Sequence, residues 1–135
     1  AATGDVAGAI RTYRDALRNF PWYRALVYYY AESLLRVNQP DEALKLVESR
    51  LQNSPSDYRL YQLQARAYAA LNKAMQQHRA LAEANFRLGN LRAAIEQLLL
   101  AQKAGDGDFF VQSRVDARLR ELRGIENDAK KDGRK

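Results

Sequence analysis

Cysteine is absent from this sequence of 135 residues, and histidine occurs once, at His78. The absence of cysteine excludes a disulfide, a thiolate zinc site and a cysteine nucleophile, and it removes any redox clue to the compartment. A metal site needs three or four ligands, and His78 has no second histidine to join it. We therefore expect His78 to be a structural or surface residue, and we expect no cofactor in this chain.

Proline and glycine are scarce, with three and seven residues, and they gather at a few points of the chain. An all-β chain would instead show turn residues at short, regular intervals. Good helix formers fill the intervals here, and apolar residues make up 47% of the sequence, which is enough for a core. No apolar run approaches the roughly 18 residues that a membrane-spanning helix requires. The composition predicts a single all-α domain without a transmembrane segment.

Charge of one sign is not concentrated anywhere in the sequence. The formal net charge is +6 and the pI is about 9.7, but the 22 basic residues are interleaved with 16 acidic ones. A basic protein can bind nucleic acid, with an affinity that falls steeply as salt rises. Because the positive charge is diffuse, the sequence favours a protein partner and argues against nucleic acid.

The sequence does contain an internal repeat with a period of 34 residues. This is the length of one helix–turn–helix unit, which cannot bury its apolar face alone and stacks on copies of itself. The period predicts an all-α solenoid of about seven antiparallel helices, a right-handed superhelix of helical hairpins closed by a C-terminal capping helix. The pairs that reveal it are Pro21 and Pro55, Ala9 and Ala43, Leu17 and Leu51, and the turn residues Gly4 and Asn38.

The repeat pattern divides the chain into successive helical units. The predicted units are residues 1–21 (second helix of a truncated first repeat), 22–55 (a complete repeat), 56–88 (a third repeat), 75–104 (a fourth repeat), 105–123 (a capping helix) and 124–135 (a disordered polar tail). Because residue 1 lies inside a repeat, we expect the chain to be part of a longer protein.

The period slips by half a unit in the third repeat. Ala94 lies 51 residues after Ala43, which is one and a half periods. Residues 75–88 fit the pattern of a first helix better than that of a second helix, so one helix is expected to serve two repeats. Small residues are expected where helices approach closely, because larger side chains would overpack these positions; they are Ala9, Ala31, Ala43, Ala65 and Ala94.

A binding groove is expected on the face lined by first helices. Successive helical residues point about 100° apart, so Tyr29 and Tyr30 are expected to pack inward while Tyr28 faces the groove. Arginines on this face could hold the carboxylates of a partner segment in bidentate fashion; the alternative is that they are only solvated surface arginines. The predicted groove residues are Tyr28, Glu32, Leu35, Arg36, Arg59, Gln62, Arg66 and, if the shared helix joins, Arg79, Glu83, Phe86 and Arg87.

Asp106 and Asp108 flank Gly107 in a way that superficially resembles a calcium loop. The remaining carboxylates and the closing glutamate of such a loop are missing, so a turn with a helix cap is expected instead.

The segments GDVAGAI…Y..AL…P and N.PDEAL…P resemble tetratricopeptide repeats over residues 4–104. The later part is also similar to the C-terminal repeat region of periplasmic zinc metallopeptidases of the β-barrel assembly-enhancing protease type. The residues that carry this second resemblance are Gly107-Asp108-Phe109, Ser113-Arg114 and Arg118-Leu119-Arg120-Glu121-Leu122.

The second resemblance implies a periplasmic protein whose zinc is bound by HExxH in a catalytic domain outside this chain. This sequence holds no such motif, so the expected function is non-catalytic. The chain would recruit substrates or outer-membrane assembly partners, among them the barrel-assembly machinery or unfolded barrel proteins. The alternative is a repeat scaffold or co-chaperone in envelope, pilus or secretion assembly with no link to a protease.

Overall fold

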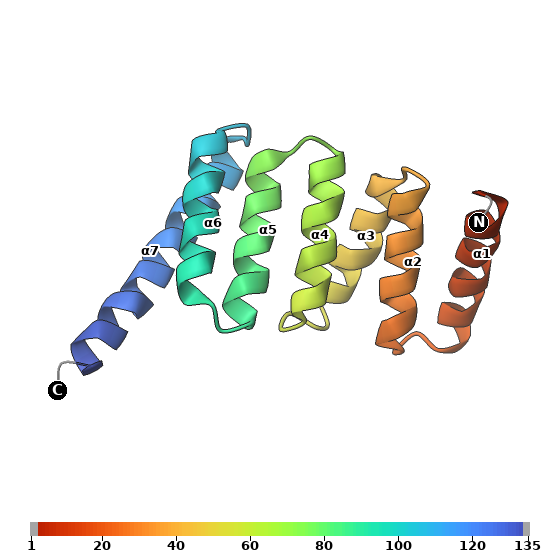
Figure 1. Ribbon diagram of the computed structural model, residues 1–135, viewed down its shortest axis with the longest axis horizontal. Helices are drawn as coiled ribbons and strands as arrows, with labels where there is room; N and C mark the ends of the chain where they lie inside the picture. Colours follow the sequence, from red (N-terminus) through yellow and green to blue (C-terminus); the bar gives the residue numbers. More distant parts are fainter. Residues whose placement is uncertain (1–2, 134–135) are drawn as a thin grey trace.

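The computed structural model describes residues 3–133, and this part of the chain is built from helices joined by short turns (Figure 1). The predicted all-α solenoid is confirmed. Most of the helices stand side by side in one row, with α3 and α7 behind it. The seven helices are α1 (Thr3–Asn19), α2 (Arg24–Arg36), α3 (Pro40–Leu51), α4 (Tyr58–Ala70), α5 (Ala74–Arg87), α6 (Leu91–Ala104) and α7 (Phe109–Gly133).

Tight turns of one kind link several of the helices. Asn38, Asn72 and Gly89 have positive φ angles of 58°, 58° and 85°, a conformation that glycine and asparagine tolerate best. Asn38 and Asn72 are one full period of 34 residues apart, and Gly89 follows Asn72 after half a period of 17. The turn chemistry therefore carries both the repeat and its slip.

Small side chains lie where the helices approach each other. Four of the five alanines expected at such positions are almost completely buried: Ala31, Ala43, Ala65 and Ala94 are at most 2% exposed. Ala9, the fifth, is half-buried on the outer helix α1. Buried residues form two clusters over α1 to α4 and a third cluster over α5, α6 and α7.

Helix α5 packs against three other helices, α4, α6 and α7. In the N-terminal half, α2, α3 and α4 form a trio in which each helix packs against the other two, so that α2 also contacts α4. The trio α5, α6 and α7 repeats this arrangement, whereas α4 and α6 make no contact. This is the packing that a helix shared by two repeats requires, although the division of the chain into repeats remains a prediction.

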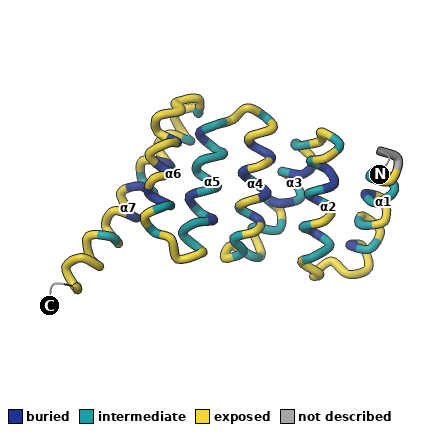
Figure 2. Tube along the Cα trace, in the orientation of Figure 1, coloured by how far each residue is buried: buried dark blue, intermediate teal, exposed yellow. Residues whose placement is uncertain are grey.

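Two expectations at the ends of the chain are wrong. The turn expected at Gly4 and Asp5 lies within α1, which begins at Thr3. Disorder was expected from residue 124, but α7 continues to Gly133 and extends beyond the body of the molecule (Figure 2). In this segment, Glu126 reaches Arg92 of α6 at 3.3 Å. Residues 134–135 lie outside the described part.

Candidate functional site

A groove of about 340 Å³ runs between α2 and α4, the first helices of neighbouring hairpins. We call it the α2–α4 groove. It brings together five of the predicted groove residues: Tyr28, Glu32, Arg59, Gln62 and Arg66. Ala25, Tyr29 and Leu63 complete its lining. The expectation that first helices line a common surface therefore holds for these two helices.

The charged groups of the α2–α4 groove are held loosely. Arg66 lies 3.8 Å from Glu32, and both side chains are about half exposed, at 55% and 47%. An ion pair this exposed contributes little to stability, because water and salt screen it. Replacing Glu32 by the carboxylate of a partner at Arg66 would therefore cost the protein little stability. Arg59 lies over the ring of Tyr28, 5.5 Å from its centroid, so its guanidinium also remains on the groove surface.

Tyr28 is the fixed wall of the groove. Its hydroxyl donates a hydrogen bond to the carboxylate of Asp57, which also caps α4 by accepting from the Arg59 amide at 3.0 Å. Burial raises the pKa of Tyr28 to about 12, and the hydrogen bond to Asp57 adds to this shift. Tyr28 is therefore a neutral donor at physiological pH, tied to the first turn of α4.

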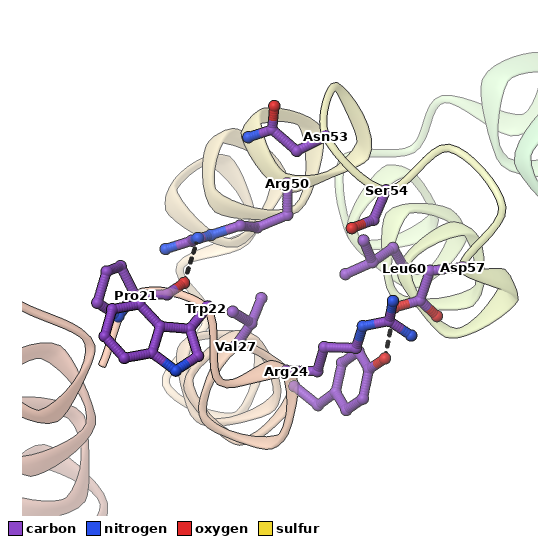
Figure 3. Close-up of a pocket in the computed structure, with 10 residues that line it drawn as sticks. Pro21, Trp22, Arg24, Val27, Arg50, Asn53, Ser54, Asp57 and Leu60 are labelled. Atoms are coloured by element: carbon purple, nitrogen blue, oxygen red, sulfur yellow. Dashed lines mark hydrogen bonds between the residues drawn. The ribbon is translucent and has the colours of Figure 1, made fainter.

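On the other side of Tyr28 lies a second hollow of about 410 Å³, which we call the loop-end pocket (Figure 3). Its floor is formed by the buried side chains of Val27 and Leu60, and the indole of Trp22 lies at one edge, beside Pro21. Arg24 and Arg50 stand at its rim, together with Asp57. An apolar floor with a few polar groups at the rim is the usual composition of a binding pocket.

The side chains around the loop-end pocket differ in how firmly they are held: Arg50 is hydrogen-bonded, whereas Trp22 is exposed. Arg50 donates a hydrogen bond to the carbonyl oxygen of Pro21 at 2.5 Å, which joins the α1–α2 loop to α3. Trp22 is 74% exposed, and its ring lies edge-on to that of Phe20, at a centroid distance of 6.3 Å. A tryptophan this exposed beside an apolar pocket is suited to cover the side chain of a partner.

The loop-end pocket was not predicted from the sequence, in which Trp22 is only the first residue of a repeat unit and neither Arg24 nor Arg50 has an expected role. A signal was present: Phe20, Trp22 and Tyr23 surround Pro21 in a stretch that joins two helices, and large aromatic side chains in such a loop have no core position to fill. All three are more than half exposed.

The other predicted groove residues lie elsewhere. Leu35 packs into the N-terminal core, and Arg36 is exposed near the end of α2, outside the groove lining. Phe86 packs against the C-terminal core cluster. Of the three tyrosines on α2, Tyr29 does not pack inward: it is 54% exposed and stacks on Tyr13 of α1 at 5.8 Å.

Helix α4 separates the predicted groove into two surfaces. Arg79 and Glu83 share a small hollow with Tyr61, Gln64 and Tyr68 of α4. At about 100° per residue, these α4 residues lie on the side opposite to Arg59, Gln62 and Arg66. Arg87 also lies on the far side, 4.7 Å from the ring centroid of Tyr61. The groove was expected to continue onto α5; the half-period slip turns that part of the surface to the other side.

Asp106 and Asp108 act as helix caps. The two carboxylate oxygens of Asp106 accept hydrogen bonds from the amides of Ala74 and Met75, each at 2.7 Å, at the start of α5. Asp108 accepts from the amide of Val111 at 2.9 Å in the first turn of α7. The hydrogen bond from the Met75 amide is the main cause that lowers the pKa of Asp106.

His78 lies with its Nδ1 2.8 Å from the amide oxygen of Gln97. Within residues 3–133 no cluster of three or more histidine and acidic side chains is placed to bind a metal ion. In the same part of the chain, no helix is both long and apolar enough to cross a membrane.

The comparisons agree with the helical geometry. The tetratricopeptide repeat family matches residues 1–67, which include α1, α2, α3 and most of α4. The match supports a tetratricopeptide repeat domain in this part of the chain, and repeats of this kind generally mediate protein–protein interactions. The comparison with curated proteins found no match.

Proposed function

We propose that this chain is a non-catalytic protein-binding module that holds an extended segment of a partner across the α2–α4 groove and the loop-end pocket. The observation that supports this most strongly is that Tyr28 lines both hollows, so that they adjoin each other. Arg59 and Arg66 offer bidentate donors to partner carboxylates. The loop-end pocket takes an apolar side chain between Trp22 and the floor of Val27 and Leu60.

Peptides selected from a random display library on this protein provide the test. Their affinity is compared, by calorimetry, for the wild type and for the double variant Arg59→Glu with Arg66→Glu. We expect the double variant to bind at least about tenfold more weakly, because it replaces two donors by two like charges. The variant Trp22→Ala should bind peptides that carry a large apolar residue more weakly than the wild type does.

A matched control is Arg11→Glu with Arg120→Glu, which changes the net charge equally at exposed positions outside both hollows. Equal weakening in the control and the groove variant would mean that the peptides respond to overall charge. Unchanged affinity in the groove variant would remove the α2–α4 groove as the binding surface.

We further propose that the module is the tail of a periplasmic zinc-dependent protease that recruits substrates or outer-membrane assembly partners. The support is the resemblance of the last turn and helix, through Gly107-Asp108-Phe109 and Arg118-Leu119-Arg120-Glu121-Leu122, to that class of enzyme. Zinc would then be bound only in a separate catalytic domain. The full reading frame is the direct test: HExxH behind a signal peptide supports the protease, and a frame without HExxH supports a scaffold.

A further inference from the structure

The loop-end pocket and the α2–α4 groove lie in a fixed order along the same two helices. The floor of the pocket, Val27 and Leu60, belongs to the first turns of α2 and α4. The groove adjoins the pocket at Tyr28, which lines both hollows. On α4 the groove extends from Arg59 to Arg66. A segment that leaves the pocket along the groove therefore passes Arg59 first and Arg66 second.

The two arginines of the groove lie on the same face of α4. Arg59 and Arg66 are seven residues apart in the sequence, which is about two helical turns and about 10.5 Å along the helix axis. Both are exposed. An extended segment advances by about 3.3 Å per residue, so about three of its residues span the distance between the two arginines.

The opposite wall of the groove differs beside these two arginines. The period of 34 residues relates Ala25 of α2 to Arg59 and Glu32 of α2 to Arg66. Ala25 lines the groove with a small side chain and no charge. Glu32, in contrast, places its carboxylate 3.8 Å from Arg66. This exposed pair shows where the carboxylate of a ligand meets Arg66, and it is weak enough to be exchanged.

The charges of the two hollows favour an acidic ligand. Each hollow is lined by two arginines and one carboxylate, so each carries one excess positive charge. The carboxylate at the pocket, Asp57, is already engaged, because it accepts hydrogen bonds from the Tyr28 hydroxyl and the Arg59 amide. Arginine side chains bind carboxylates in bidentate fashion. The pocket in turn has an apolar floor, so the ligand needs one large apolar residue as well.

We propose that the ligand is an extended segment of a partner protein with one large apolar residue and two acidic residues at a fixed spacing. The apolar residue fills the loop-end pocket. Its immediate neighbour points away in an extended chain, so the acid about two residues from it pairs with Arg59. The acid about three residues further along pairs with Arg66 and displaces Glu32. This spacing rests on the proposed function and adds the sequence pattern that the ligand carries.

The test is an exchange of charges between protein and peptide, followed by calorimetry. The probes are blocked synthetic peptides of serine and glycine that carry one phenylalanine and two glutamates at this spacing, made in both chain directions. Replacing the far glutamate by lysine should weaken binding to the wild type by about tenfold. The variant Arg66→Glu should bind this lysine peptide about tenfold more tightly than the wild type does, whereas Arg59→Glu should not.

The outcomes separate the spacing from the proposed function. Tighter binding of the lysine peptide by Arg59→Glu, or by both variants equally, would overturn the assignment of the far acid to Arg66. If neither designed peptide binds while library-selected peptides occupy the groove, the pattern is wrong and the proposed function stands. If the selected peptides also fail to bind there, both are wrong.

The variant Glu32→Gln provides a second measurement, in which affinity should rise. It frees Arg66 from its own carboxylate, so the peptide with two glutamates should bind about three- to fivefold more tightly. A peptide whose far glutamate is replaced by glutamine should bind it no more tightly than the wild type. The matched control is Glu42→Gln, at an exposed position of α3 outside both hollows. An equal rise in the control, or with the glutamine peptide, would contradict the pairing at Arg66.

Discussion

At the scale of single residues, the turn between α6 and α7 shows how few atoms set the geometry of the C-terminal half. Gly107 packs so closely on α5 that a Cβ atom on it would lie 2.5 Å from the sulfur of Met75. Met75 is itself only 2% exposed and cannot move aside into solvent. Asp106, one residue earlier, caps α5 with both carboxylate oxygens. A single dipeptide therefore fixes α5 against the start of α7.

The close approach at Gly107 predicts that Gly107→Ala destabilises the protein by about 1–3 kcal/mol, the usual range for overpacking. Gly124→Ala is the matched control: Gly124 lies within α7, and a Cβ atom there would meet nothing within 4 Å. Alanine favours a helix over glycine, so the control should gain about 0.5–1 kcal/mol. Urea unfolding of the three proteins measures both changes. Loss of stability in both variants, or in neither, would contradict the packing at Gly107.

The cap at Asp106 predicts that Asp106→Ala lowers the free energy of unfolding by about 1–2 kcal/mol near neutral pH. The pKa of Asp106 in the folded protein is lowered below its ordinary value of 3.8. Its contribution is therefore complete above that value and is lost as pH falls through the folded pKa. The difference between wild type and variant should shrink when unfolding is repeated at about pH 2.5.

Asp128→Ala serves as the control for this experiment, since Asp128 is exposed on α7. It should change stability by less than about 0.5 kcal/mol at either pH. A difference for Asp106→Ala that stays constant with pH would show that its carboxylate is not the capping group.

At the scale of helices, α5 and α7 are joined through Glu83. Its side chain is 16% exposed, and those of its partners Arg87 and Arg118 are each 22% exposed. The Phe86 ring lies beside both guanidinium groups, at 5.7 and 4.8 Å. Arg87 also donates to the carbonyl oxygen of Pro55 at 2.9 Å. This network connects α7 to the loop before α4, although the elements are far apart in sequence.

Because Glu83 is itself mostly buried and pairs with two half-buried arginines, Glu83→Gln should destabilise the protein by about 2–3 kcal/mol. The comparable change Glu96→Gln affects a pair with Arg92 at 3.8 Å whose side chains are 73% and 64% exposed. It should cost less than about 0.5 kcal/mol. Thermal or urea unfolding distinguishes the two, and equal effects would indicate that the Glu83 network contributes no more than a surface pair.

The helices themselves could largely be predicted from the sequence, because their signals are local. Asn72 and Gly89 mark turns, and the spacing of the alanines marks the helix contacts. The length of α7 could not be predicted, because the polar sequence after Gly124 lacks an apolar face and is poor in helix formers, and because Glu126 finds its partner Arg92 on another helix. Tyr29 was misplaced because its environment is set by Tyr13 of another helix.

At the scale of the whole molecule, the half-period slip decides which residues share a surface. The first helices α2 and α4 place Tyr28, Arg59 and Arg66 in one groove. The slip at α5 places Arg79 and Glu83 on the opposite side of α4. The sequence predicts that these positions continue one groove, because the periodicity gives the order of the helices but not which face of each helix lies on a common surface. The residues predicted to line one groove therefore lie on two separate surfaces of the molecule.

Because these residues lie on two separate surfaces, substitutions on one surface are predicted to leave peptide binding at the other unchanged. Peptides that bind the α2–α4 groove should lose affinity in Arg59→Glu with Arg66→Glu but should bind Arg79→Gln as tightly as the wild type. Groups that share no contacts usually have additive effects. A double-mutant cycle in calorimetry measures this, and a coupling free energy above about 0.5 kcal/mol would contradict the separation.

The central claim is that a partner segment lies across the α2–α4 groove and the loop-end pocket. The most direct measurement is a map of backbone amide shifts by NMR during titration with a library-selected peptide. The account predicts that the largest shifts surround Tyr28, Arg59 and Trp22. Shifts confined to α6 and α7, with none around Tyr28, would contradict it.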